Sequence, residues 1–69
     1  IDIFVFVKDE PGILSKITTI LYQNNINIKD IELLKIREGT GGTFRLSFLT
    51  ENEAKQAKDL LEVIGFTTK

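Results

Sequence analysis

The sequence lacks cysteine and histidine altogether. Disulfides, thiolate metal sites, cysteine nucleophiles and Ser-His-Asp triads are therefore excluded within its 69 residues. We expect this chain to contain no catalytic residue, no metal and no cofactor. The absence of cysteine also fits a cytoplasmic location.

Neither an excess of one charge nor a long apolar run is present. Nine Lys and Arg stand against ten Asp and Glu, so no net charge favours nucleic acid or an anionic membrane as a partner. The longest apolar run, IFVFV, covers only residues 3–7, whereas a membrane-spanning helix needs roughly 20 residues. The composition predicts a soluble domain with neither nucleic acid nor a membrane among its partners.

The chain is short and opens on Ile1, inside an apolar alternation. Natural chains seldom begin in the middle of a strand, so we expect residues 1–69 to form a single domain that belongs to a longer protein. So short a chain buries only a small core, and a partner surface would therefore add stability.

Apolar periodicity predicts the elements of secondary structure. Alternation of β-branched and aromatic residues indicates strands, and apolar residues spaced three and four apart indicate helices. Thr50 to Glu53 matches a capping box, and Gly65 suits the position just after a helix. The expected elements are a strand at 1–7, a helix at 12–24, a strand at 27–38, a hairpin turn at 38–42, a strand at 43–49, a helix from the capping box to Gly65 and a short strand at 66–69. The predicted core comprises Ile13, Leu14, Ile17, Leu21, Phe44, Leu46, Phe48, Leu60 and Leu61.

This order of elements predicts an α+β fold, the ferredoxin-like βαββαβ sandwich. Right-handed crossovers place both helices on one face of a four-stranded antiparallel sheet. The other face is left open, and an open face or edge on so small a domain invites a second copy. Arg45 and Lys35 are interpreted as solvated charges on the sheet, with Glu32 and Asp30 as candidate partners across a dimer.

The stretch DEPG, residues 9–12, joins the first strand to the first helix. Asp9 can hold a turn, Glu10 suits the positive end of the helix dipole, and Pro11 can set the first helical φ. Gly12 leaves the amides of residues 12–14, including those of Ile13 and Leu14, uncovered. A carboxylate on these amides and an ammonium beside Asp9 together describe an amino acid. A purely structural turn explains the same residues without a ligand.

Two other functions of this fold fit the residues less well. GGTFRLSF, residues 41–48, is superficially similar to an RNA-recognition signature, but Thr43 and Arg45 stand where the base-stacking aromatics belong. An enzyme would need a nucleophile or an acid/base pair. Asp9 and Glu10 are neighbours in sequence, but adjacency alone does not make such a pair.

The whole chain resembles the ACT domain, a regulatory module attached to enzymes of amino-acid metabolism. FVFVKDEPGILSKITTIL is similar to its strand, Pro-Gly turn and first helix, and NNINIKDIEL is similar to the segment that enters its second strand. The resemblance implies that two copies pair side by side into an eight-stranded sheet. It also implies that an amino acid binds at the interface, between Asp9 to Leu14 of one copy and the region of Asn27 and Ile28 in the other.

The run NINIKDIELLKIRE, with the following GGTFRLSF, looks most like the C-terminal ACT domain of bacterial prephenate dehydrogenases. That resemblance implies an NAD-dependent catalytic part outside this chain, a place in tyrosine biosynthesis and an aromatic amino acid as effector. Val7 and Asp9 stand where some ligand-binding members carry histidine and asparagine, which argues against serine. The alternative is a constitutive dimerisation domain without a ligand, in which Gly12 and Asn27 are turn residues only.

Overall fold

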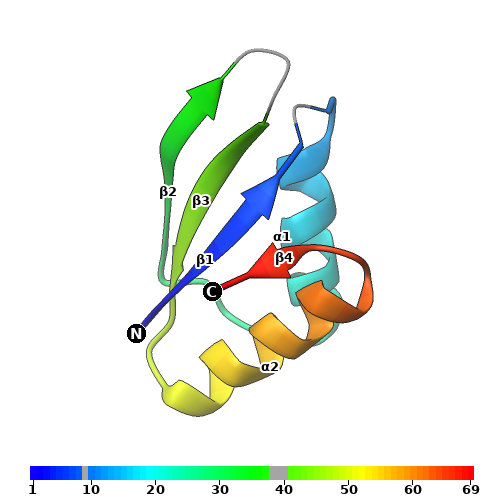
Figure 1. Ribbon diagram of the computed structural model, residues 1–69. Coiled ribbons are helices and arrows are strands. Elements are labelled where there is room, and N and C mark those ends of the chain that lie inside the picture. The colour runs from blue at the N-terminus through cyan, green and yellow to red at the C-terminus, as the bar shows by residue number, and fades with distance from the viewer. Residues whose placement is uncertain (9, 38–40) are drawn as a thin grey trace.

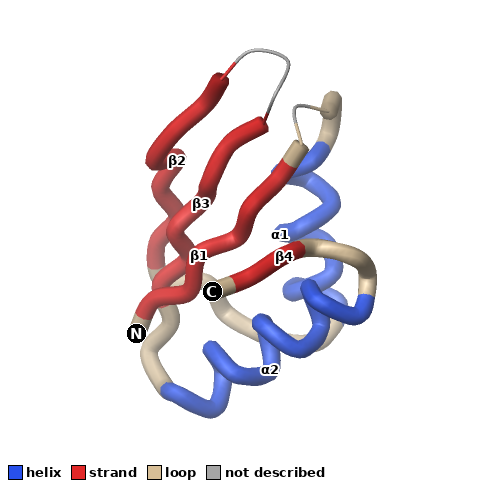
Figure 2. Tube along the Cα trace, viewed as in Figure 1, coloured by secondary structure: helices blue, strands red, loops and turns tan. Residues whose placement is uncertain are grey.

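A four-stranded antiparallel sheet carries two helices on one of its faces (Figures 1 and 2). The computed structural model describes residues 1–8, 10–37 and 41–69, and of residues 36 and 37 only the backbone. The strand order is β2-β3-β1-β4, so β2 and β4 are the edges. The elements are β1 (Asp2–Val7), α1 (Ile13–Gln23), β2 (Asp30–Arg37), β3 (Gly41–Ser47), α2 (Glu51–Val63) and β4 (Thr67–Thr68). The predicted ferredoxin-like fold is confirmed.

The pairing of β1 with β3 separates the two faces of the sheet. Ile3 lies opposite Leu46 and both are buried, which marks the face that the helices cover. Phe4 lies opposite Arg45 on the other face, because successive side chains of a strand point to opposite sides. Phe6 follows on this open face and remains 42% exposed.

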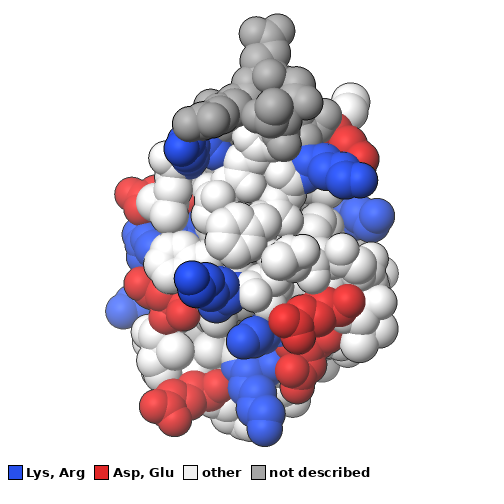
Figure 3. All heavy atoms as spheres, in the orientation of Figure 1, with Lys and Arg blue, Asp and Glu red and all other residues white. Residues whose placement is uncertain are grey.

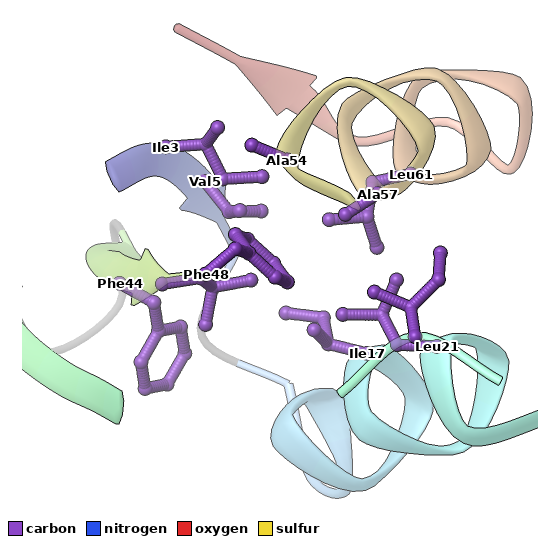
Figure 4. Packing of buried hydrophobic residues seen from close by; sticks show 11 residues of the cluster. Ile3, Val5, Ile17, Leu21, Phe44, Phe48, Ala54, Ala57 and Leu61 are labelled. Carbon is purple, nitrogen blue, oxygen red and sulfur yellow. The ribbon is translucent and has the colours of Figure 1, made fainter. Parts of the chain in front are cut away.

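The hydrophobic core fills the space between the sheet and the two helices. Figure 4 shows side chains from β1, β3, α1 and α2 converging, with Phe48 between the sheet and the helices. The buried apolar residues are Ile3, Val5, Ile17, Leu21, Ile26, Phe44, Leu46, Phe48, Ala54, Ala57 and Leu61. Most of the predicted core is confirmed, with Ile13 and Leu60 partly buried against it.

Leu14 was predicted to lie in the core, and this prediction is wrong. Its side chain is 41% exposed. At 100° per residue, the apolar stripe of α1 is centred on Ile17, with Leu14 at one margin and Ile20 at the other. Ile20 lines a groove with Ile64, the residue that caps the end of α2, so the margin that carries Leu14 faces away from that end of α2.

The helix ends follow the local sequence. Thr50 Oγ1 accepts a hydrogen bond from the Glu53 N–H at 3.1 Å, as the capping motif predicts. Both helices end in a left-handed residue, Asn25 with φ of 57° after α1 and Gly65 with φ of 109° after α2. In each case the N–H of the left-handed residue and that of the residue after it donate back to carbonyls of the last turn, as in a Schellman motif. Neither helix, within the ranges described above, is long and apolar enough to cross a membrane.

The bounds of β2 and β3 differ most from the prediction. β2 begins at Asp30 rather than Asn27, because the Asn27 N–H is directed toward a carboxylate of α2 instead of β3. β3 runs from Gly41 to Ser47 instead of 43–49. Of the two glycines assigned to the turn, Gly41 pairs with β2, and Gly42 pairs with both β1 and β2. The rest of the predicted hairpin turn, residues 38–40, lies outside the described residues.

Candidate functional site

The Pro-Gly turn follows β1 and starts α1. Gly12 is the N-cap, in the left-handed conformation with φ of 76°, and the helix begins at Ile13. The sequence suggested that Pro11 sets the first helical φ, and this prediction is wrong. Pro11 precedes the cap, and Ile13 is the first helical residue. The positive φ of Gly12 bends the backbone after the proline, so the helix can begin only at the next residue. Asp9 lies outside the described residues.

The surface of this turn combines polar backbone with apolar side chains. Glu10, Pro11 and Gly12 are exposed, Ile13 is partly buried against the core, and Leu14 is substantially exposed. The N-cap is a glycine, which carries no side chain that could accept from the amides at the start of α1. Their partial positive charge favours an anion.

A hollow of about 370 Å³ lies beside the turn, between β1, the start of α1 and the turn that joins α2 to β4. Glu10, Lys8 and Lys16 supply charged groups to its wall. Its remaining lining is Phe6, Val7, Ile13, Ile64, Gly65, Phe66 and Thr67. Residues 64–67 carry no sequence signal that places them next to the Pro-Gly turn, because this proximity depends on how α2 packs.

Asn27 and Ile28 lie at the opposite end of α1. Asn27 is exposed, and its N–H donates to Glu53 Oε2 at 3.4 Å, whereas Ile28 packs partly buried against the core. Eleven helical residues separate these two from Gly12, a length of about 16 Å. Within one copy, the structure therefore does not bring together the two halves of the predicted binding site.

β2 is the longer of the two edge strands, with eight residues against two in β4. Two of its leucines, Leu33 and Leu34, are 47% and 46% exposed. The pairing register with β3 shifts between Leu33 and Lys35, a bulge that brings Lys35 onto the open face opposite Thr43. Apolar side chains on a long free edge make β2 the edge best suited to pair with another chain.

Arg45 is the centre of a charged cluster on the open face. Its guanidinium bonds Glu32 Oε1 at 3.1 Å, Asp2 Oδ2 at 3.4 Å and Asp30 Oδ2 at 3.4 Å. It also donates to Ser47 Oγ at 2.8 Å, and Ser47 in turn donates to Asp2 Oδ1 at 2.6 Å. Arg45 is thus paired within its own chain, where the sequence suggested a solvated charge. The sequence could have indicated this cluster, because the alternation of side chains along β1, β2 and β3 puts all five of these residues on one face of the sheet.

The cluster shifts the pKa values of two of its members. The hydrogen bond from Ser47, followed by the charge of Arg45, lowers the pKa of the Asp2 carboxyl below its usual value. The hydrogen bond to Glu32 raises the pKa of the Arg45 guanidinium. Both groups therefore stay ionised at neutral pH. Among the residues that the structure describes, no group of acidic side chains is arranged to hold a metal ion.

Comparison with known proteins gives consistent matches. The family model described as "ACT domain" matches residues 1–65. A prephenate dehydrogenase of Bacillus subtilis is 38% identical over 61 residues, which are 88% of this chain but only 16% of that protein. The chain thus spans a small part of the curated relative that it matches.

Solved structures agree with these matches. The ACT domain of prephenate dehydrogenase from Bacillus anthracis superposes with a TM-score of 0.90 at 35% identity, and the match covers 100% of both chains. The regulatory subunit of aspartate kinase from Thermus flavus superposes with a TM-score of 0.82 at 19% identity, over 99% of this chain and 48% of that one. The second likeness, at such low identity, concerns the fold alone.

Proposed function

The chain belongs to the ACT domain family of regulatory domains, and from this premise we propose that it senses an amino acid held between two copies of itself. The proposed effector is an aromatic amino acid. The proposed host is a cytoplasmic, NAD-dependent prephenate dehydrogenase of tyrosine biosynthesis, with the catalytic part and its NAD outside this chain. The resemblance to the Bacillus domains supports this host.

One observation carries the proposal. The two sets of predicted contact residues lie at opposite ends of α1, about 16 Å apart, which is longer than an amino acid. A single small ligand can touch both Gly12 and Asn27 only if they come from different copies. The separation of Gly12 from Asn27 therefore supports a binding site that is complete only when a second copy is present.

Pairing through β2 would bring the two halves together. Val7 and Ile36 both pair with Gly42, so the Pro-Gly turn lies at the level where β2 ends, whereas Asn27 precedes its start. Antiparallel pairing of two β2 strands about a twofold axis reverses the chain direction across the edge. The turn of one copy then lies level with Asn27 of the other.

The chemistry of the turn suits an amino acid with an apolar side chain. Its carboxylate would accept from the amides of residues 12–14, and Asp9 or Glu10 would face its ammonium. Leu14 of α1 is substantially exposed and offers apolar contact beside the turn, and the exposed Leu33 and Leu34 offer it along the edge strand β2. Burial of an aromatic ring against these leucines would add the hydrophobic part of the affinity.

Regulation would follow from unequal affinity for two arrangements of the pair. A ligand shifts such an equilibrium only by the difference between its affinities for the two states, typically about 1–3 kcal/mol of coupling. The amino acid would thereby favour one arrangement of whatever the two copies are attached to.

The test combines isothermal titration with analytical ultracentrifugation. We expect the chain to sediment as a dimer and to bind tyrosine, phenylalanine or tryptophan saturably, with serine as the negative control. Asn27→Ala should weaken binding about tenfold, because it removes a polar contact but keeps the backbone N–H that meets Glu53. Asn52→Ala, at an exposed asparagine on α2, is the matched control and should bind as the parent does.

Two outcomes would contradict the proposal. A folded dimer that binds none of the three aromatic amino acids would favour constitutive dimerisation. Saturable binding by a monomer would show that one copy forms the whole site, contrary to the separation of Gly12 from Asn27.

A further inference from the structure

The connection between α1 and β2 passes beside the first turn of α2 (Figure 2). It carries Asn27, which belongs to one half of the proposed amino-acid site. Ile26, the residue before it, is buried, and its N–H donates to the Leu21 carbonyl oxygen at the end of α1 at 3.0 Å. The Lys29 N–H donates to the Ser47 carbonyl oxygen on β3 at 2.8 Å. The connection is therefore anchored on both sides of Asn27.

At Asn27 itself, the backbone is held by a side chain from another element. Its N–H donates to Glu53 Oε2 at 3.4 Å, across 26 positions of sequence. The other carboxylate oxygen, Glu53 Oε1, accepts from the Thr50 hydroxyl at 3.2 Å, and the Glu53 N–H donates to Thr50 Oγ1 at 3.1 Å. These reciprocal bonds with Thr50 orient the carboxylate that meets Asn27.

The partners of this carboxylate differ from those of the usual capping box. There the acid bonds the backbone N–H of the N-cap residue, so the motif is closed locally. Among the described residues, the Glu53 carboxylate bonds instead the hydroxyl of Thr50 and the N–H of Asn27. The bond to Asn27 does not cap α2, because its donor belongs to a distant segment. Its effect is on the connection that carries Asn27.

We propose that Glu53 is a positioning residue for the amino-acid site, and that it fixes the backbone at Asn27 so that the Asn27 side chain is presented to the effector. This role of Glu53 rests on the function proposed above. Asn27 is exposed, whereas Ile26 is buried and Ile28 packs against the core. A binding residue that is already held in place loses less conformational entropy on binding, and this raises the affinity.

The charge of Glu53 can be separated from its hydrogen bond. Glu51 carries the same charge in the same first turn of α2. In Figure 3, charged side chains of both signs lie over α2, so one carboxylate does not by itself set the charge of this surface. Glu51→Ala removes an equal charge and an equal interaction with the helix dipole while Asn27 keeps its acceptor. It is therefore the matched control.

Isothermal titration of the chain with tyrosine, phenylalanine and tryptophan tests this role. We expect Glu53→Ala to weaken binding about fivefold, the effect of one lost hydrogen bond. Glu53→Gln keeps an oxygen that can accept from the Asn27 N–H, so it should bind as the parent does, and so should Glu51→Ala. Circular dichroism at the temperature of the titration confirms that each variant is folded.

Hydrogen exchange of the Asn27 amide, measured by NMR, gives a second readout that loss of helix capping does not move. It should be faster in Glu53→Ala than in Glu51→Ala, with the Ile26 amide, whose acceptor is unchanged, as the internal reference. Equal affinities, or equal exchange at Asn27, in these two variants would overturn the role of Glu53. Weak binding by Glu53→Gln would also overturn it, because the charge would then be what matters. A parent chain that binds none of the three amino acids would instead contradict the proposed function itself, and the role of Glu53 with it.

Discussion

Arg45 Nε on β3 donates to Glu32 Oε1 on the neighbouring β2 at 3.1 Å, across the open face of the sheet. The same guanidinium reaches Asp2 on β1, so that one side chain joins three strands. These contacts connect an edge strand to the two central strands, so we expect the cluster to stabilise the pairing of β1, β2 and β3.

Replacement of Arg45 by alanine should lower the melting temperature. The change leaves three carboxylates close together without their cation, and their mutual repulsion adds to the loss of the hydrogen bonds. Lys35→Ala, which removes a cation from the same face, is the control and should have a smaller effect. Thermal unfolding followed by circular dichroism compares them, and equal shifts would show that the cluster does not stabilise the sheet.

The stability that Asp2 contributes should depend on pH. Its folded-state pKa is lowered, first by the hydrogen bond from Ser47, so its contribution is fully present above the unfolded value of about 3.9. It is lost as the pH falls below that value and through the lower folded-state pKa. Urea unfolding of the parent and Asp2→Asn should therefore differ near neutral pH and converge in acid. A difference that grows in acid would reverse this assignment.

Gly41→Ala should destabilise the fold more than Gly12→Ala. Gly41 has φ of 117°, and an added Cβ would collide with the backbone carbonyl oxygen of Val7. Gly12 also has a positive φ, but its Cβ would point into open space, so that change should cost only about 1 kcal/mol of backbone strain. Chemical denaturation measures both, and equal costs would contradict the close approach at Val7.

Thr50→Ala should destabilise the chain by about 1 kcal/mol, because it leaves the first-turn N–H of Glu53 without its acceptor. Thr50→Ser keeps the hydroxyl and is the matched control. The free energy of unfolding from urea titration distinguishes the two. A serine variant as unstable as the alanine variant would assign the effect to the lost methyl group instead.

The local elements were predictable because their signals are local. Thr50 with Glu53, Asn25 and Gly65 specify helix ends through contacts within a few residues, and alternation along β1 and β3 specifies their buried faces. The wrong predictions concern residues whose surroundings depend on distant contacts or on their exact angle on a helix. Asn27 was assigned to a strand, but its N–H meets Glu53 of α2, and Leu14 was assigned to the core although it lies on the margin of its helix.

The sequence by itself determined the fold and the residues at which a ligand would be sought, because hydrophobic periodicity, capping motifs and the Pro-Gly turn are all encoded within short segments. The helix predicted from the sequence already places Gly12 and Asn27 at its two ends. Only the tertiary structure decided that residues 64–67 form a hollow with the turn, and that Arg45 contacts carboxylates from β1 and β2. These relationships depend on strand register and helix packing, which the whole chain settles at once through burial of its single core.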